Sequence, residues 1–488
     1  MNNALRILPQ SDVVAGLRRR QIGTSAQMMD EPRPNVPFLI LLALSVVLAL
    51  ANLPIPGKWV HLWAFILIVL DVLNRTLQRN PKLDLIYIWY AGYMYSVFID
   101  GFFSSDKIIQ NVGVYYYDKA SMIIAGSMAA LLLGYNLSSS KKKSVESSYY
   151  LVSKSTVIFI VANILLFIAL SYQDIVNGFL SGRLWIYSDI VRGREFATMY
   201  ITRDISAIFT QTYVTTTALI MPALIGYYFH RIKNHSIFVA LLISAPYLMY
   251  EFSNGSRHNF FISIVGLLLT TFRRHMFNLN LKLVSKLGAV ALVVFSATVV
   301  QYYGRMHGFA LDNIVYNQSS QDMKFEGTVE TLAMFAGYME GKPPLLGQEV
   351  MIILTYFIPR KFWPDKPVGA GQWMLREIST SVTNPVHSAA VSFAGTMFLD
   401  WGFHFGILSC ILLGLLIRKM NSTLMASFDG QGPTIILAGT LIGLELYAVR
   451  SLLAAIIQMY ALLLFYYLYK LVFCKKVHFD QPNRLRQQ

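Results

Sequence analysis

Apolar residues fall into blocks of roughly 15–25 residues along this chain, and short polar connections separate the blocks. A helix of that length crosses a bilayer core of about 30 Å. The pattern predicts an all-α, polytopic membrane protein with about twelve transmembrane helices. The predicted segments are 36–53, 59–73, 83–99, 120–136, 155–172, 205–229, 236–250, 260–272, 287–303, 391–417, 433–449 and 451–469.

Two of the connections are long, at about 173–204 and 304–390. Within the second, Gln348–Ile358 is apolar but too short to cross a bilayer, so we expect a short amphipathic or re-entrant helix there. The chain is 55% hydrophobic and 14% charged, which argues against a set of soluble domains. We predict one transmembrane domain over 35–472, with tails at 1–34 and 473–488.

Charge predicts the orientation. The chain carries 41 Lys+Arg and 26 Asp+Glu, a formal net charge of +15. With the N-terminus inside, roughly 25 of the 41 basic residues and roughly 8 of the 26 acidic residues fall on the inner side. The positive-inside rule therefore predicts that both termini are cytoplasmic and that the long connections face the periplasm across a bacterial inner membrane. It also explains the positive charge through membrane lipids, without nucleic acid as a partner.

Arginines on the predicted outer side oppose this bias, so each is expected to have a partner. A guanidinium group binds phosphate or carboxylate through two parallel hydrogen bonds, so the set predicts an anion site. Local ion pairs, such as Arg194 with Glu195, are the alternative for single members. The outer arginines are Arg183, Arg192, Arg194, Arg203, Arg257, Arg305, Arg360, Arg376 and Arg450.

Arg257 and Arg450 lie in short turns between apolar segments. A charge so close to hydrocarbon is costly unless it is paired. Arg257 follows Gly255 at a predicted helix start, where anions bind well, although a pair with Glu251 is the alternative. Arg450 has only Glu445 as an acidic neighbour about one turn away, and its alternative is to extend to the membrane surface.

A proline-stiffened cluster in the second long connection is the richest local group of charges and rings. Cations suit a diphosphate, and aromatic faces suit sugar rings, although an interfacial anchor has the same composition. Its sequence is Ile358-Pro359-Arg360-Lys361-Phe362-Trp363-Pro364-Asp365-Lys366-Pro367.

Two points of chemistry remain: which residue acts as the general base, and whether the site holds a metal ion. The candidate bases are outer histidines and carboxylates. Asp100 and Asp106 are spaced too far apart for the acidic pair that holds a divalent metal in many lipid-phosphosugar transferases, so we expect no metal and no cofactor, with arginines at the pyrophosphate instead. The base candidates are His258, His307, His387, Glu251, Asp365 and Glu377.

Three elements together resemble Wzy-type polymerases of O-antigen or oligosaccharide repeat units. The topology is also similar, with many helices, cytoplasmic termini and two outer loops. The elements are the Ser253–Arg257 turn, the run Pro359-Arg360…Trp363-Pro364-Asp365-Lys366-Pro367, and the run Ser388…Gly395…Asp400-Trp401-Gly402…Gly406.

The resemblance implies a membrane glycosyltransferase with a GT-C-like fold. Such an enzyme transfers a growing glycan from undecaprenyl diphosphate onto a lipid-linked repeat unit, in some cases with a chain-length regulator as partner. On this interpretation Arg257, Arg360 and Arg450 stabilise the leaving diphosphate, and His387 or Glu251 is the base. The predicted substrate-binding residues are Arg192, Arg194, Arg203, Arg305, Trp363, Asp365 and Lys366.

Three alternatives stay open. An O-antigen ligase shares the topology and the outer arginines, but the Trp363–Pro367 run favours the polymerase. A lipid-linked oligosaccharide transporter places ionisable residues at mid-membrane depth, and here Asp71 and Glu445 are candidates for such positions. A purely structural scaffold does not explain the number of outer arginines.

Overall fold

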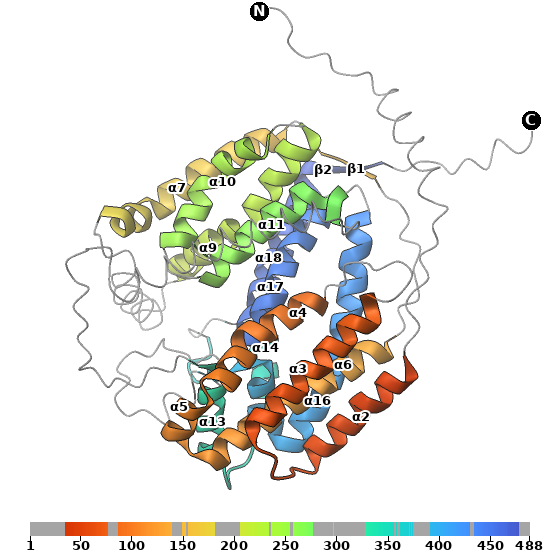
Figure 1. The fold of residues 1–488 in the computed structure, drawn as a ribbon. Coiled ribbons are helices and arrows are strands. Elements are labelled where there is room, and N and C mark those ends of the chain that lie inside the picture. The colour runs from red at the N-terminus through yellow and green to blue at the C-terminus, as the bar shows by residue number, and fades with distance from the viewer. Residues whose placement is uncertain are drawn as a thin grey trace, which may run out of the picture.

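The structure is a computed structural model of the chain. It describes residues 35–76, 86–138, 149–152, 155–180, 205–233, 236–253, 257–276, 296, 327–355, 358, 362–369, 371, 373, 391–429 and 434–477. Within these ranges the chain folds into two helical lobes (Figure 1).

The first lobe packs around α6, a helix that is buried along most of its length. η1 continues α4 as a π-helix, a geometry that often marks strain or function. α13 comes from the second long connection and packs against α5, η1 and α6. The helices of this lobe are α2 (Val36–Leu50), α3 (Gly57–Thr76), α4 (Ile86–Tyr93), η1 (Met94–Phe103), α5 (Ser105–Val112), α6 (Val114–Leu137), α13 (Thr328–Tyr338) and α16 (Ser392–Asp429).

The second lobe has its own apolar core, and its helices α17 and α18 also contribute residues to the core of the first lobe. α17 packs against α11 and α18 within this lobe, and against α4 and α16 of the first lobe, so it joins the two. The short helix α14 (Gln348–Thr355) packs against α18 and α16. The helices of the second lobe are α7 (Ser155–Leu180), α9 (Ile205–Ile225), η2 (Gly226–Ile232), α10 (Ile237–Ser253), α11 (Arg257–Met276), α17 (Thr434–Arg450) and α18 (Leu452–Phe473).

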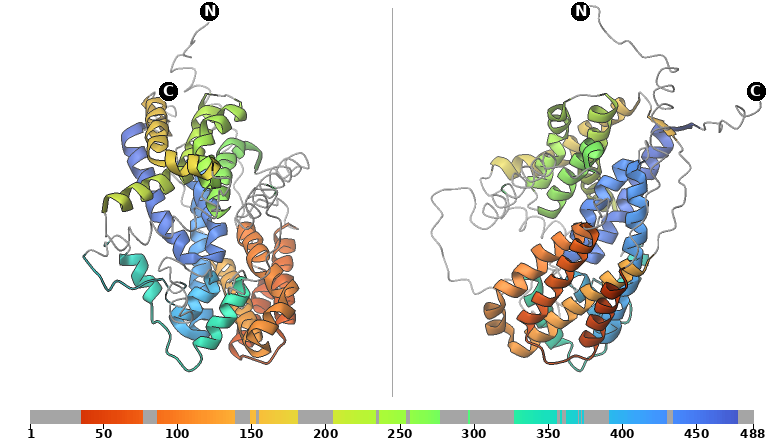
Figure 2. Two further views of the ribbon diagram at one scale, coloured as in Figure 1. Left: turned by 90° about the vertical axis from the view of Figure 1, so that its left-hand side faces the viewer. Right: turned by 45° about the vertical axis from the view of Figure 1, so that its right-hand side comes forward.

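One short pair of strands interrupts the helical architecture. β1 (Tyr149–Val152) pairs antiparallel with β2 (Cys474–Val477), with Tyr149 opposite Val477. The apolar pattern did not predict this pair, because four-residue strands carry almost no periodic signal. We call the end of the bundle with this pair the β end. The opposite end, with α5, α13 and the start of α6, is the α13 end (Figure 2).

The helices have the apolar surface expected of a membrane protein. Helices cover eleven of the twelve predicted segments, and the twelfth, 287–303, lies almost wholly outside the described residues. α2 shows the lipid-facing character well, because Val36, Ile40, Leu44 and Val47 are exposed along one face while Phe38 and Leu42 are buried on another.

Four of the described helices are long and apolar enough to cross a membrane: Gly57–Arg75, Val114–Leu137, Ser155–Gln173 and Ser392–Leu424. Five further apolar helices are shorter, at Val36–Leu50, Ile237–Phe252, Asn259–Thr271, Ile435–Glu445 and Gln458–Phe473. The predicted helical architecture is therefore confirmed, with four helices that could cross a membrane by length and composition. The number of crossings and the GT-C-like fold stay predictions.

Glycines let α6 and α16 approach each other closely. A Cβ built on Gly134 would lie 2.0 Å from the carbonyl oxygen of Ile411, and one on Gly414 would lie 2.1 Å from the carbonyl oxygen of Leu131. Both neighbours are backbone atoms, which cannot move aside as a side chain can. Close backbone contact through small residues is a common way to join helices in membranes.

Candidate functional site

Asp100, at the α13 end of η1, caps α13 although it lies 229 residues from its partner in sequence. Its Oδ2 accepts a hydrogen bond from the backbone N–H of Val329 at 3.0 Å. A Cβ on Gly327 would lie 2.4 Å from Oδ1, so a larger residue there would have to displace the carboxylate. The carboxylate stabilises the N-terminus of α13 by hydrogen bonding and by charge.

Asp400 caps the N-terminus of α14 in the same way. The backbone N–H of Glu349 donates to its two carboxylate oxygens at 3.1 and 3.2 Å. Beside it, the N–H of Leu345 donates to the carbonyl of Leu399 at 2.9 Å. α16 departs from helical geometry at Gly402, where φ is 75°. The start of α16 thus holds the segment that leads into α14.

Lys366 fixes the Trp363–Pro367 run to the other end of α14. Its Nζ donates to the carbonyl of Thr355 at 2.7 Å and to that of Ile358 at 3.1 Å. The backbone N–H of Lys366 also donates to the carbonyl of Trp363 at 3.1 Å, which closes a turn. A cation is favourable at a helix C-terminus. Lys366 therefore has a structural role, and its predicted role at the diphosphate stays a prediction.

The other two predicted site residues of this run, Trp363 and Asp365, differ in their surroundings. Trp363 is half-buried, whereas Asp365 is exposed. Both lie on a turn that contacts α14 at both of its ends, through Lys366 at Thr355 and through the Gln348 amide, which donates to the carbonyl of Val368 at 2.8 Å. The structure leaves their predicted contacts with substrate as predictions.

Arg257 and Arg450 lie at ends of helices that connect to this assembly through α18. Arg257 is the first residue of α11, and Arg450 is the last residue of α17. The Gln458 amide in the second turn of α18 donates to Asn259 Oδ1 at 3.3 Å, so the starts of α18 and α11 are joined. α14 packs against α18. The side chains of both arginines lie outside what the structure describes.

Glu251 lies in the last turn of α10 and is fully buried. Such a position is costly for an ionised carboxylate and is expected to have a functional or structural reason. Its role as the base stays a prediction. Six predicted site residues lie outside the described residues: Arg192, Arg194, Arg203, Arg305, Arg360 and His387.

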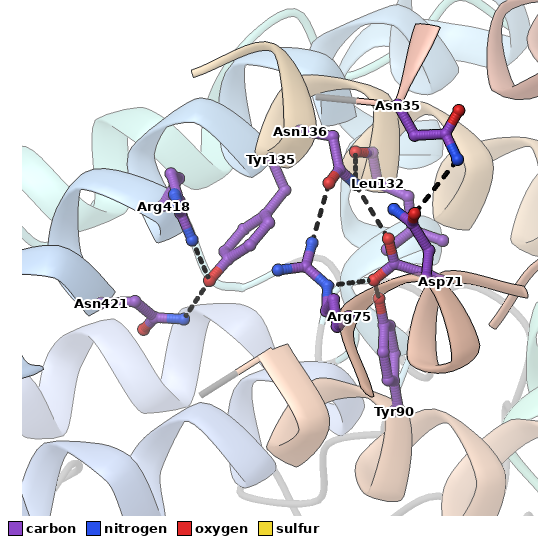
Figure 3. A network of polar contacts seen from close by, with 10 residues as sticks. Asn35, Asp71, Arg75, Tyr90, Leu132, Tyr135, Asn136, Arg418 and Asn421 are labelled. Carbon is purple, nitrogen blue, oxygen red and sulfur yellow. Dashed lines mark hydrogen bonds and ion pairs between the residues drawn. The ribbon is translucent and has the colours of Figure 1, made fainter. Parts of the chain in front are cut away.

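A second polar centre lies within the membrane helices, toward the β end. Asp71 in α3 is fully buried and accepts a hydrogen bond from Arg75 Nε at 2.5 Å (Figure 3). The Tyr90 hydroxyl of α4 donates to the same carboxylate oxygen. Arg75 also donates to Asn136 Oδ1 of α6 at 2.8 Å. One carboxylate thus joins three helices.

The Tyr135 ring continues this polar centre toward α16. The guanidinium carbon of Arg75 lies 5.2 Å from the centroid of the ring, and that of Arg418 lies 5.1 Å from it. Arg418 Nη1 also lies 3.4 Å from the Tyr135 hydroxyl. The two cations repel each other, and the aromatic ring and the nearby carboxylates offset that repulsion.

Glu445 of α17 supplies the second carboxylate. Trp89 Nε1 of α4 donates to its Oε2 at 3.2 Å. The Asn421 amide lies 3.3 Å from the Tyr135 hydroxyl, and with its nitrogen turned toward Glu445 it donates to Oε1 at 2.5 Å. We adopt that orientation because a carboxylate can only accept.

Among the residues that the structure describes, this intramembrane network contains two carboxylates and two guanidinium groups, so their formal charges balance. It joins α3, α4, α6, α16 and α17 across both lobes. At a rise of about 1.5 Å per residue, Glu445 lies about 16 Å along α17 from its start. The members are Asp71, Arg75, Trp89, Tyr90, Tyr135, Asn136, Arg418, Asn421 and Glu445.

The sequence analysis singled out Asp71 and Glu445 but missed their partners. Arg75 follows Asp71 by four residues, a helical spacing that could have indicated the pair. The contacts of Glu445 join residues 356 positions apart, and no local pattern predicts them. Compared with protein-family models, curated proteins and solved structures, the chain matches none.

Proposed function

We propose that this protein is a polysaccharide polymerase, a GT-C-like membrane glycosyltransferase that works without a metal ion. It transfers a growing glycan from undecaprenyl diphosphate onto a lipid-linked repeat unit at the outer face of a bacterial inner membrane. One observation carries the proposal. The Trp363–Pro367 turn is anchored to α14, and α14 packs on α18, whose start is joined to the start of α11. Arg257 begins α11 and Arg450 ends α17, so two of the proposed arginines lie at helix ends of one assembly that also holds the Trp363–Pro367 turn.

The proposed reaction places defined demands on such an assembly. The acceptor hydroxyl gives its proton to a base, its oxygen attacks C1 of the donor sugar, and the bond from C1 to the diphosphate breaks. Undecaprenyl diphosphate leaves, with negative charge growing on its oxygens. Preorganised donors at that charge contribute about 3–4 kcal/mol each, and we assign this role to Arg257, Arg360 and Arg450. The base is Glu251 or His387.

The site needs rigid support, because a misplaced donor loses most of its effect. The contacts at both ends of α14 supply such support: Asp400 at its start and Lys366 at its end. The two prolines on either side of Asp365 stiffen the turn further. The arginines of the first long connection, Arg192, Arg194 and Arg203, are proposed to hold the acceptor diphosphate.

The test is a polymerisation assay with the purified full-length protein and undecaprenyl-diphosphate-linked repeat units from its own host. We expect a ladder of glycans that survives EDTA. Arg257→Ala and Arg360→Ala should each reduce the rate by about 10²–10³-fold. Arg273→Ala, at the opposite end of α11 from Arg257, is the matched control and should keep its activity.

A ladder abolished by EDTA would refute the metal-free mechanism. Equal activity in Arg257→Ala and Arg273→Ala would refute the assignment of Arg257. Transfer of the glycan to lipid A core, in place of elongation, would identify the ligase alternative.

The intramembrane network favours a second candidate, a transporter of lipid-linked oligosaccharides. Paired ionisable residues deep in a helical bundle often mark transport pathways. Asp71 and Glu445 are such residues, and both are buried. Movement of the lipid-linked sugar across liposomes without any elongation, lost in Glu445→Gln, would establish this candidate in place of the polymerase.

A further inference from the structure

A polar aromatic surface lies at the α13 end, where the start of α6 meets the end of α13. Tyr115 and Tyr116 begin α6, and Glu340 follows α13. The Tyr115 hydroxyl donates to Glu340 Oε1 at 3.1 Å, and the Tyr116 hydroxyl donates to Oε2 at 3.1 Å. Lys119 Nζ lies 3.6 Å from the same carboxylate. The two rings and the carboxylate therefore form one fixed group.

The two tyrosines have different surroundings. Tyr116 packs against α13, because a Cβ on Gly337 would lie 3.3 Å from its ring. Tyr115 stands nearly perpendicular to Tyr116 and is 58% exposed. Tyr115 thus offers an open aromatic ring at a position that its neighbours hold.

Further groups extend the surface along α13. Lys342 Nζ lies 3.1 Å from the centroid of the Tyr338 ring, and Trp373 meets that ring edge-on at 6.3 Å. In the first turn of α13, Glu330 Oε1 accepts a hydrogen bond from the Asn111 amide of α5 at 2.7 Å. Rings beside planar carboxylate and amide groups are the combination that binds sugars, because ring faces contact sugar C–H groups while polar groups bind hydroxyls.

Lipid is a poor occupant for this surface. Interfacial tyrosines keep their rings in the bilayer and their hydroxyls in water. Here the hydroxyls bind a carboxylate that is 46% exposed, and two lysine ammonium groups lie within the same group of side chains. Charges at such density indicate an aqueous surface. A diphosphate is equally unsuited, because Glu340 would repel it.

We propose that this surface holds the saccharide portion of the substrate, away from the diphosphate and the reacting sugar. The inference rests on the proposed function, since it names where the glycan of that reaction lies. Tyr115 provides the stacking face, and Glu340 binds sugar hydroxyls. α13 packs on α5 and α6 whereas α14 packs on α18, so the surface and the proposed transfer site lie on different helices.

The test measures binding of a lipid-free oligosaccharide of two repeat units, released from the host's polysaccharide, to the full-length protein in detergent. We expect saturable binding that weakens at least about tenfold in Glu340→Ala, which loses hydrogen bonds to a charged group. Tyr115→Ala should weaken it strongly, and Tyr115→Phe less, because the ring remains. Tyr172→Ala in α7 removes a tyrosine with the same 58% exposure and should bind as the wild type does.

The polymerisation assay separates this proposal from the proposed function. In Glu340→Ala and Tyr115→Ala the transfer site is intact but glycan binding is weakened. In these variants single transfers should persist while long products are lost. Binding without any ladder would support the glycan site and reject the polymerase. A ladder with no oligosaccharide binding, or equal binding by all four variants at matched melting temperatures, would overturn the glycan site and leave Tyr115 as an interfacial anchor only.

Discussion

Asp71→Asn is expected to destabilise the protein far more than the loss of one surface carboxylate. Asp71 is fully buried, and its partner Arg75 is 8% exposed. Asparagine has nearly the same shape, so the change removes the charge and leaves the packing in place. Arg75 then keeps its hydrogen bond to Asn136 but loses the buried negative charge that balances it.

The magnitude follows from burial. Removing one partner of a buried ion pair costs about 3–5 kcal/mol, because the remaining charge stays out of water. The matched control is Asp106→Asn. Asp106 accepts from Lys58 Nζ at 2.9 Å, but the two side chains are 83% and 44% exposed. Exposed pairs contribute about 0.2–1 kcal/mol, so this change should be nearly neutral.

Equilibrium unfolding in mixed micelles measures both variants on the same scale. A double variant, Asp71→Asn with Arg75→Met, tests the cause directly. Because it removes the uncompensated cation, it should recover most of the lost free energy of unfolding. Equal stability for the Asp71 and Asp106 variants, or no recovery in the double variant, would refute the argument that charge balance in the network is what matters.

Two further predictions rest on single contacts. Gly414→Val should prevent stable packing of α6 on α16, because its Cβ would overlap the backbone at 2.1 Å; Gly266→Ala, with 3.3 Å to its nearest neighbour, should be tolerated in the same melting assay. Hydrogen bonds from Tyr115 and then Tyr116 lower the pKa of Glu340, so the carboxylate stays ionised below its ordinary pKa. Oligosaccharide binding measured against pH should persist through the ordinary carboxyl range and fall only at lower pH, whereas a loss centred on the ordinary value would contradict this assignment.

The apolar pattern predicted the helices well because burial in lipid demands long apolar segments. α2, α3, α6 and α18 begin and end within a few residues of the predicted segments, apart from the extension of α6 toward Val114. Irregular features were not predicted. The π-helix η1 and the kink at Gly402 depend on neighbours that meet only in the folded chain.

The site was predictable only in part for a similar reason. The turn around Lys366 stood out by composition, and its proposed ligand was a phosphate. The structure shows that its ammonium donates to two backbone carbonyls, which composition alone did not indicate, and the phosphate contact stays a prediction. Likewise, Asp100 and Asp400 carry no local sign that they cap helices from the second long connection, because those partners lie far away in sequence.

The burial of α6 has a consequence for biogenesis. α6 is the most deeply buried of the long apolar helices, and its closest partner, α16, begins about 250 residues later in the chain. At roughly 5–20 residues per second, translation leaves α6 without that partner for roughly 13–50 s. During this time its glycine face meets lipid or an insertion factor. The early part of the polar network, Asp71 with Arg75 and Asn136, is charge-balanced by itself, so this buried ion pair does not depend on the later arrival of α16.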